Sequence, residues 1–123
     1  MEVIDGGGAD IVLGLNIRGD GRDDVRRYID STGVPPKLFA FMAPGLPGSQ
    51  SIAGSAEASA FAIAVREQLG SLLKNNGVRK TRLFFYGPQA LAIFFGQQLT
   101  SVGMIQLFEY QDPGYCPSLL LST

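Results

Sequence analysis

The segment from Leu83 to Phe108 contains no charged residue, and this absence restricts the fold more than any other feature of the sequence. Side chains of this kind are buried in a core, face a partner or cross a membrane. A membrane span needs about 18 consecutive apolar residues, whereas Gly87, Pro88 and Gln89 interrupt the apolar run, as do glycine and polar residues between positions 96 and 101. We therefore interpret the segment as a buried strand–helix–strand unit.

Strands and helices alternate along the whole chain. Apolar, β-type runs predict strands over Ala9–Ile17, Lys37–Ala43, Thr81–Tyr86, Met104–Tyr110 and Tyr115–Leu121. Helical spacing, caps and breakers predict helices over Arg22–Thr32, over Ser55–Asn76 and from Gly87-Pro88 onward. Such alternation predicts an α/β fold with a mainly parallel sheet, helices on both of its faces and a C-terminal antiparallel hairpin. Pro117 suggests that the last strand lies at an edge of the sheet.

The chain length of 123 residues predicts a single domain. Residues 1–8 end in three glycines, so we expect a flexible N-terminal segment followed by one folded domain over residues 9–123. The N-terminus lacks the basic and apolar stretches of a signal peptide. A lone cysteine, Cys116, offers no intramolecular disulfide and fits a reducing, cytoplasmic setting.

The composition excludes several classes of function. The sequence has no histidine, which rules out Ser-His and Cys-His nucleophile pairs and histidine-containing zinc sites. The formal net charge of −1 argues against a binder of duplex nucleic acid, which needs a strongly basic surface. No carboxylate pair or metal-binding cluster has the spacing of a known motif. These absences favour a binding domain over an enzyme, with no catalytic residue, metal or cofactor.

In a parallel α/β sheet, ligands collect at the carboxyl ends of the strands, beside helix N-termini. This rule selects three loops, at residues 16–22, 43–55 and 86–89. The first loop contains Arg18, Gly19, Asp20 and Arg22. The guanidinium groups of its arginines suit phosphates, but they can equally pair with the neighbouring aspartates. The glycines allow a ligand to approach the backbone, although ordinary turns also need glycine.

The other two loops offer uncharged groups. In the second loop, Ser49, Gln50 and Ser51 carry hydroxyl and amide groups that suit ribose or base edges, or they are ordinary solvated loop residues. The third loop consists of Tyr86, Gly87, Pro88 and Gln89. It presents free amides at the start of a helix, and the Tyr86 ring either stacks on a base or lies in the core.

The strongest basic cluster, Val78–Arg82, lies at the amino end of the third predicted strand. That end is opposite the edge where ligands are expected. We therefore interpret the cluster as a solvated end of the sheet or as a partner contact, and not as the primary site.

The stretch LFFYGPQALAIFFGQQL, followed by IQLFEYQDPGYCPSLLL, resembles the C-terminal half of SAVED domains. These carry a pattern of the form Phe-x-x-x-Pro-x-x-x-Ala-x-x-x-Gly, then a strand ending in tyrosine and a short closing strand. The pattern maps onto Phe84 or Phe85, Pro88, Ala92 and Gly96, and then onto Leu107, Tyr110 and Tyr115. The similarity spans roughly Ile11 to Leu121 and includes the long helix that follows the Ser51-Ile52 loop.

The resemblance implies a Rossmann-like, CARF-like fold and a function. SAVED domains are bacterial antiphage sensors that resemble two fused CARF-like units. They bind cyclic oligonucleotides made by a partner synthase or a CRISPR complex, and binding drives an oligomerisation that activates an effector. The resemblance thus implies a non-catalytic sensor of a cyclic oligoadenylate or a related cyclic tri- or tetranucleotide, in CBASS or type III CRISPR defence. By position, the corner Tyr86–Gln89 and the loop Pro44–Ser55 would contact the ligand, with Arg18–Arg22 at the same edge.

The chain departs from the family in length, because 123 residues suffice for one CARF-like unit and not for two. Two alternatives to the sensor therefore stay open. One is an assembly subunit that pairs with a SAVED-like or effector chain and has no ligand of its own. The other is a small ring nuclease, for which Arg18, Ser49 or Ser51 would be the catalytic candidates.

Overall fold

Six strands form a single sheet in the computed structural model, which describes residues 2–17, 19–44, 55–87, 95–99, 102–111 and 114–122. The strands are β1 (Glu2–Asp5), β2 (Ile11–Asn16), β3 (Leu38–Met42), β4 (Lys80–Tyr86), β5 (Met104–Gln111) and β6 (Gly114–Ser122). Two labelled helices, α1 (Arg22–Thr32) and α2 (Ser55–Asn76), accompany them. Within the described residues, the order across the sheet is β1-β3-β2-β4-β5-β6.

The central part of the sheet is parallel, as the alternation of strands and helices predicted. β2 pairs in parallel with β3 on one side and with β4 on the other, and β4 pairs in parallel with β5. β6 returns antiparallel to β5 and lies at the edge of the sheet, which confirms the predicted hairpin and the edge position of Pro117. Because β2, β4 and β5 are parallel, their carboxyl ends meet at one edge of the sheet.

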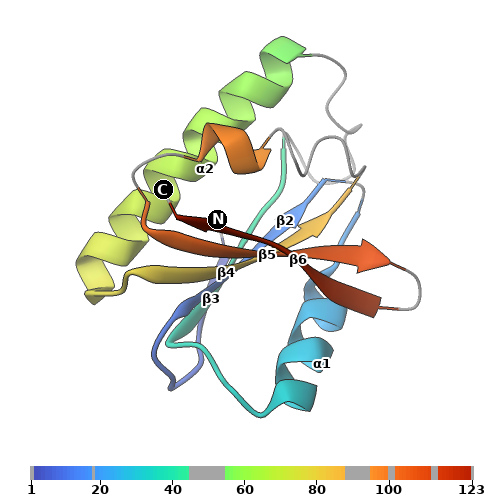
Figure 1. Cartoon of the computed structure of the whole chain (residues 1–123), viewed down its shortest axis with the longest axis vertical. Coiled ribbons are helices and arrows are strands. Elements are labelled where there is room, and N and C mark those ends of the chain that lie inside the picture. The colour runs from blue at the N-terminus through green and yellow to red at the C-terminus, as the bar shows by residue number, and fades with distance from the viewer. Residues whose placement is uncertain are drawn as a thin grey trace.

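Helices cover both faces of the sheet (Figure 1). On one face, Leu13 and Leu15 of β2 pack in a core with Val65 of α2. Residues 95–98 are helical, and Phe95 belongs to this same core. On the other face lies a smaller, aromatic core. Its buried members are Val12, Val25, Ile29, Phe39, Phe41, Phe84, Phe108 and Tyr115.

The two labelled helices have the predicted bounds. α1 begins at Arg22 and ends at Thr32, and the capping residue Gly33 that follows has a left-handed φ of 70°. The Gly33 amide donates to the carbonyls of Ile29 and Asp30, so this glycine caps the last turn. α2 is followed by Gly77, with a φ of 65°. Both glycines adopt a backbone conformation that is costly for other residues, which explains why they end the helices.

The N-terminal segment differs from the prediction. We expected residues 1–8 to be flexible, but Glu2–Asp5 forms β1, which pairs antiparallel with β3 from Glu2 opposite Phe41 to Asp5 opposite Leu38. The side chain of Ile4 packs against the aromatic core. Four residues are too few to show a strand period beside a run of glycines, so the pairing depends on the free edge of β3 and not on a local signal.

The uncharged segment is buried where the structure describes it. Leu83, Phe84 and Phe95 have no exposed surface, and Phe85 and Leu99 are 1% exposed. These residues lie in β4, in the helical residues 95–98 and at Leu99 directly after them, as the interpretation of a buried unit requires. No helix within the described residues has the length and hydropathy needed to cross a membrane.

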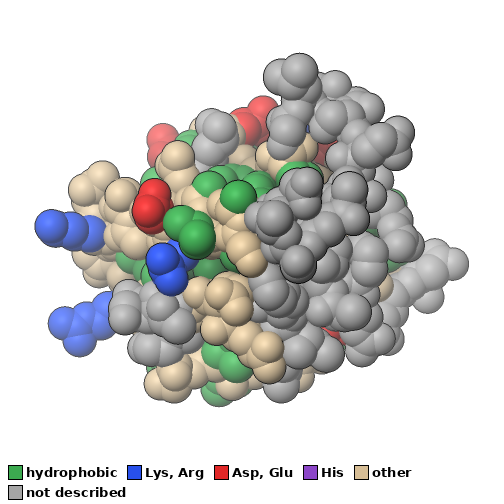
Figure 2. Space-filling model, turned by 90° about the horizontal axis from the view of Figure 1, so that it is seen from above, with side chains coloured by type: hydrophobic (Ala, Val, Ile, Leu, Met, Phe, Trp, Pro, Cys, Tyr) green, Lys and Arg blue, Asp and Glu red, His purple; other side chains and the backbone are tan. Residues whose placement is uncertain are grey.

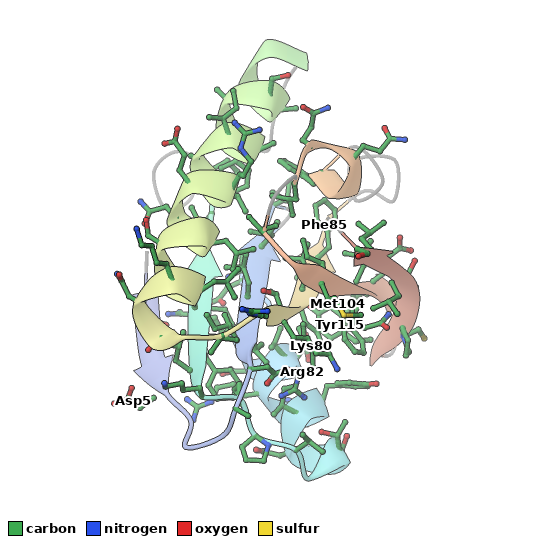
Figure 3. The ribbon with its side chains drawn as sticks, turned by 60° about the vertical axis from the view of Figure 1, so that its left-hand side comes forward. Asp5, Lys80, Arg82, Phe85, Met104 and Tyr115 are labelled. Atoms are coloured by element: carbon green, nitrogen blue, oxygen red, sulfur yellow. The ribbon has the colours of Figure 1, made fainter. Side chains whose placement is uncertain are left out.

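Arg82 is part of a buried ion pair, which corrects the interpretation of the whole Val78–Arg82 cluster as a solvated end. Its Nε donates to Asp10 Oδ2 at 2.7 Å, and its Nη2 donates to Asp10 Oδ1 at 2.8 Å and to the Val34 carbonyl at 2.9 Å. Arg82 is 8% exposed, whereas Arg79 and Lys80 are exposed. Figure 3 shows Lys80 and Arg82 below Phe85, toward the start of the same strand. Arg82 therefore links the amino end of β4 to Asp10, directly before β2, and to Val34, in the segment after α1.

Substitution of Arg82 should destabilise the fold strongly. Arg82→Met leaves the Asp10 carboxylate without its partner at a mostly buried position, so the free energy of unfolding should fall by about 3 kcal/mol. Urea denaturation measures this change. The control Arg79→Met removes the same charge from an exposed side chain and should change the value by less than about 0.5 kcal/mol. Equal effects of the two substitutions would show that the buried pair does not hold the sheet ends together.

Candidate functional site

The carboxyl ends of β2, β4 and β5 lie at one edge of the sheet, with Asn16, Tyr86 and Gln111 as their last residues. Figure 1 shows these three strands pointing toward the same side of the molecule. In the view from above, the Lys and Arg side chains of the described residues lie on the left, away from the side toward which these strands point (Figure 2). This edge is where the α/β architecture predicts a ligand.

The structure joins the first and third predicted loops. The Ile17 amide donates to the Tyr86 carbonyl at 3.0 Å. A Cβ on Gly87 would lie 2.9 Å from the Ile17 Cβ and 3.0 Å from a ring carbon of Phe85. Glycine is therefore required at position 87 by the close approach of the two loops. Ile17, Tyr86 and Gly87 thus form a shared rim at this edge of the sheet.

Three tyrosines form a cluster at this rim. The rings of Tyr86 and Tyr110 stack with centroids 5.1 Å apart and an interplanar angle of 20°. Tyr115 meets Tyr110 edge-on at 5.3 Å. Tyr86 follows Phe84 by two residues and Tyr110 follows Phe108 by two, so both project on the α1 side of the sheet, where Phe84 and Phe108 stack. We call Tyr86, Tyr110 and Tyr115 the tyrosine cluster.

The first loop packs onto the tyrosine cluster through Gly21. Its amide donates to Asn16 Oδ1 at 3.1 Å, which closes the loop between β2 and α1. A Cβ on Gly21 would lie 2.8 Å from Cδ2 of Tyr86 and 2.9 Å from the hydroxyl oxygen of Tyr115. The backbone thus approaches two of the rings so closely that any side chain would push them aside.

The Tyr115 hydroxyl is enclosed without a hydrogen-bond partner. Tyr115 is 6% exposed, and its hydroxyl oxygen is one of two enclosed side-chain oxygens in the described residues that have no partner. Burial raises the pKa of this phenol well above its ordinary value, and negative charge on Asp24, Tyr86 and Tyr110 raises it further. A buried hydroxyl without a partner lowers stability, because its hydrogen bonds to water are lost on folding and not replaced.

Arg22 is engaged by two carboxylates. Its Nη2 donates to Asp20 Oδ2 at 2.6 Å, and its Nη1 donates to the Glu2 carboxylate at 3.0 Å. Hydrogen bonds from the Arg22 side chain and amide lower the pKa of Asp20, and the two carboxylates raise the pKa of Arg22. The pairs are exposed, so each contributes little to stability. The local pairing considered from the sequence is therefore present, and Glu2 of β1 adds to it.

The predicted site residues divide into two groups. Gly19, Asp20, Arg22, Tyr86 and Gly87 lie at the carboxyl edge, with Gly19 exposed. The remaining predicted site residues lie outside the described residues: Arg18, Ser49, Gln50, Ser51, Pro88 and Gln89. Their contact with a ligand stays a prediction. Within the described ranges, no group of His, Cys, Asp and Glu side chains could hold a metal ion.

Asn16 and Gly21 fall within the first predicted loop, and Tyr110 ends a strand predicted to reach the same edge. These three residues and Tyr115 were nevertheless not among the predicted ligand-binding residues. Side chains two residues apart in a strand lie on the same face of the sheet. The spacing from Phe84 to Tyr86 and from Phe108 to Tyr110 could therefore have indicated that both tyrosines lie on the face of the two phenylalanines. The approach of Tyr115 depends on the register of the β5–β6 hairpin, in which Tyr110 pairs with Tyr115. The role of Gly21 depends on packing between elements and has no local signature.

The family model described as "SMODS-associated and fused to various effectors sensor domain", SAVED, matches residues 1–121. None of the curated proteins matches the chain. Two solved structures of the Acinetobacter baumannii Cap4 SAVED/CARF-domain containing receptor are similar, one with the cyclic trinucleotide 2'3'3'-cAAA and one with 3'3'3'-cAAA. Their TM-scores are 0.75 and 0.72, each at 20% identity, over 99% and 98% of this chain. The chain spans only 26% of either receptor chain, and the likeness shows a common Rossmann-like, CARF-like fold.

Tyr115 should make stability fall at alkaline pH. The unfolded phenol ionises near pH 10, whereas the folded phenol keeps its proton to higher pH. Above about pH 10 the unfolded state therefore binds fewer protons, and the free energy of unfolding decreases as pH rises, by about 1 kcal/mol per pH unit. Urea denaturation at about pH 9 and about pH 11 measures the loss.

The variant Tyr115→Phe should lose less stability over the same interval. Tyr28→Phe is the matched control, because the Tyr28 ring also contacts Phe84 on this face. A wild-type protein and a Tyr115→Phe variant with the same alkaline loss would contradict the predicted role of the enclosed phenol.

Proposed function

Since the chain belongs to the SAVED family of sensor domains, we propose that it binds a cyclic oligonucleotide at the carboxyl edge of its sheet. The protein is then a cytoplasmic, non-catalytic sensor in antiphage defence, either in CBASS or in type III CRISPR. Ligand binding drives oligomerisation, which passes the signal to an effector. The ligand is a cyclic oligoadenylate or a related cyclic tri- or tetranucleotide, in keeping with the cyclic trinucleotides bound by the similar receptor.

The tyrosine cluster is the observation that carries this proposal. The side chain of Tyr86 is half-buried, and it lies where the first and third loops meet. Every nucleobase has a flat face that can stack on an aromatic ring, and such stacking contributes about 1–3 kcal/mol per base. A rim with aromatic rings suits the bases of a ring-shaped ligand.

Arg22 supplies the charge that the ligand phosphates require. Its guanidinium is held by Asp20 and Glu2 in exposed pairs, which stabilise the protein little. A ligand phosphate can therefore replace a carboxylate at modest cost, with the same bidentate geometry. Glu2 belongs to β1, so this exchange would link ligand binding to the strand at the edge of the sheet.

Isothermal titration with 2'3'3'-cAAA and 3'3'3'-cAAA tests the proposal. The wild-type chain should release or absorb heat with at least one ring. Tyr86→Ala removes the stacking surface and should weaken binding about tenfold or more, whereas Tyr86→Phe keeps the ring and should bind within about threefold of wild type. Urea denaturation of each variant separates loss of binding from loss of folding.

Absence of heat from the wild-type protein with both rings would count against a sensor of this ligand class. Equal affinity of Tyr86→Ala and wild type would move the ligand away from the tyrosine cluster. Cleavage of either ring during prolonged incubation would favour the ring nuclease instead.

One observation favours the second candidate, an assembly subunit. β6 is an edge strand of nine residues, Gly114–Ser122, and it contains no charged residue. Edge strands that remain unpaired usually carry charges that prevent association. If β6 pairs with another chain regardless of ligand, size-exclusion chromatography should show dimers whose elution volume does not change on addition of either cAAA ring. A monomer that shifts to a larger species only with ligand would support the sensor.

A further inference from the structure

Glu109 is a nearly buried carboxylate at the same edge of the sheet. It lies in β5, in register with Phe85 of β4 and with Cys116 of β6. Strand alternation places it on the α2 side, in line with Ile105 and Leu107, which have no exposed surface. Phe85, its neighbour across the strand pair, is 1% exposed and contacts Phe95 at a centroid distance of 5.7 Å. Glu109 therefore ends an apolar layer of the core.

The carboxylate has no partner in the described part of the chain. Glu109 is 7% exposed, and no ion pair or hydrogen bond reaches its side-chain oxygens from the described residues. The oxygens are not among the fully enclosed, unpartnered atoms, which are the hydroxyls of Thr81 and Tyr115. Glu109 keeps 7% of its surface exposed and lies two residues before the end of β5, so a ligand at the carboxyl edge can approach it.

Such an arrangement is unfavourable in the free protein. A carboxylate that loses most of its water without gaining donors costs stability, and charged groups cost more than neutral ones. Packing of the core around Phe85 and Leu107 does not need a charge, because a side chain of similar shape could fill the position. A group that costs stability in the free state and lies near a ligand edge commonly serves binding.

The ligand chemistry follows from the charge. A carboxylate accepts hydrogen bonds and repels phosphates, so this part of the edge selects a neutral N–H or O–H donor. Arg22, which can pair phosphates, lies on the opposite, α1 side of the sheet edge. The two side chains together would orient a ring with its phosphates toward α1 and a base toward α2.

We propose that Glu109 reads a base of the bound ring, by accepting a hydrogen bond from an exocyclic amino group such as that of adenine. This inference rests on the proposed function and adds a specificity-determining residue to it. A hydrogen bond to a carboxylate is about twice as strong as one between neutral groups. The bound amine would supply the donor that the free protein lacks, so the contact favours rings that carry an amine at this position.

The first arm of the test measures stability without ligand. Glu109→Met replaces the carboxylate with an apolar side chain of similar length, and Glu109→Gln keeps the shape and removes the charge. Because no protein partner is lost, the thermal midpoint of both variants should be equal to that of wild type or higher. Glu67→Gln is the control, since it removes the same charge from an exposed position of α2. A lower midpoint for both Glu109 variants would reveal a structural partner and overturn the inference.

The second arm measures affinity by titration with the cAAA ring that the wild type binds. Glu109→Gln should weaken binding about tenfold and Glu109→Met by up to about a hundredfold, whereas Glu67→Gln should leave it unchanged. The same ring with purine in place of adenine lacks the amino groups. Wild type should bind this ring about tenfold more weakly, and Glu109→Met, which has no comparable acceptor, should no longer distinguish the two rings.

The outcomes separate this inference from the proposed function. Unchanged affinity of both Glu109 variants, in a protein that binds the ring, would overturn the role of Glu109 and leave the sensor intact. A loss on Glu109→Gln without discrimination against the purine ring would assign the donor to a ribose hydroxyl and overturn base reading. No binding by the wild type would overturn the sensor and this inference together.

Discussion

The burial of β2 on both faces is the constraint on which the remaining structure depends. Five consecutive residues, Ile11–Leu15, are buried, and the strand is hydrogen-bonded to β3 on one side and to β4 on the other. A strand in this position has no solvent-facing side, so a helical layer must cover each face. Because its neighbours run parallel to it, the loops that leave β2 and β4 meet at one edge. The site is a consequence of this geometry before any functional residue is considered.

The two ends of the sheet are built by different interactions. At the amino ends, Arg82, Asp10 and the Val34 carbonyl satisfy one another and fix the strands. At the carboxyl ends, the Tyr115 hydroxyl and the Glu109 carboxylate have no partner within the described residues. Polar groups that are satisfied stabilise a fold, whereas unsatisfied groups cost stability and are retained where they serve another purpose. The Thr81 hydroxyl near the amino end of β4 also lacks a partner among the described residues, so the difference between the two ends lies in their charged groups. Arg82 and Asp10 are paired at the amino ends, whereas Glu109 near the carboxyl end of β5 is not paired in the described part of the chain.

Much of the architecture could be predicted from the sequence because its signals are local. The bounds of α1 follow from the spacing of Val25 and Ile29 and from Gly33, and the final hairpin follows from a turn between two apolar runs. β1 could not be found in this way, since a four-residue strand is defined by the edge it joins. Arg82 was assigned to a solvated cluster for the same reason: its partner Asp10 is distant in sequence and adjacent only in the sheet.

The sequence was enough to predict where the candidate site lies, but it predicted only some of the side chains that form it. The rule for parallel sheets selected Tyr86 and Gly87 correctly as residues of the carboxyl edge. Which side of the sheet Tyr86 faces, and that Tyr110 would stack on it, depends on strand register. Glu109 was overlooked because it directly follows the uncharged segment, and its burial becomes apparent only when Phe85 is aligned beside it.

The contrast between the two edge strands has a consequence for how far an assembly can grow. β1 carries exposed carboxylates at Glu2 and Asp5, whereas β6 carries no charge. Two β6 edges can face each other across a two-fold axis, and the joined sheet would then end in a β1 strand on either side. Exposed charges at these ends, Asp5 and the Glu2–Arg22 pair, discourage further addition of strands. Edge pairing in this chain would therefore close at two copies and not propagate into a filament.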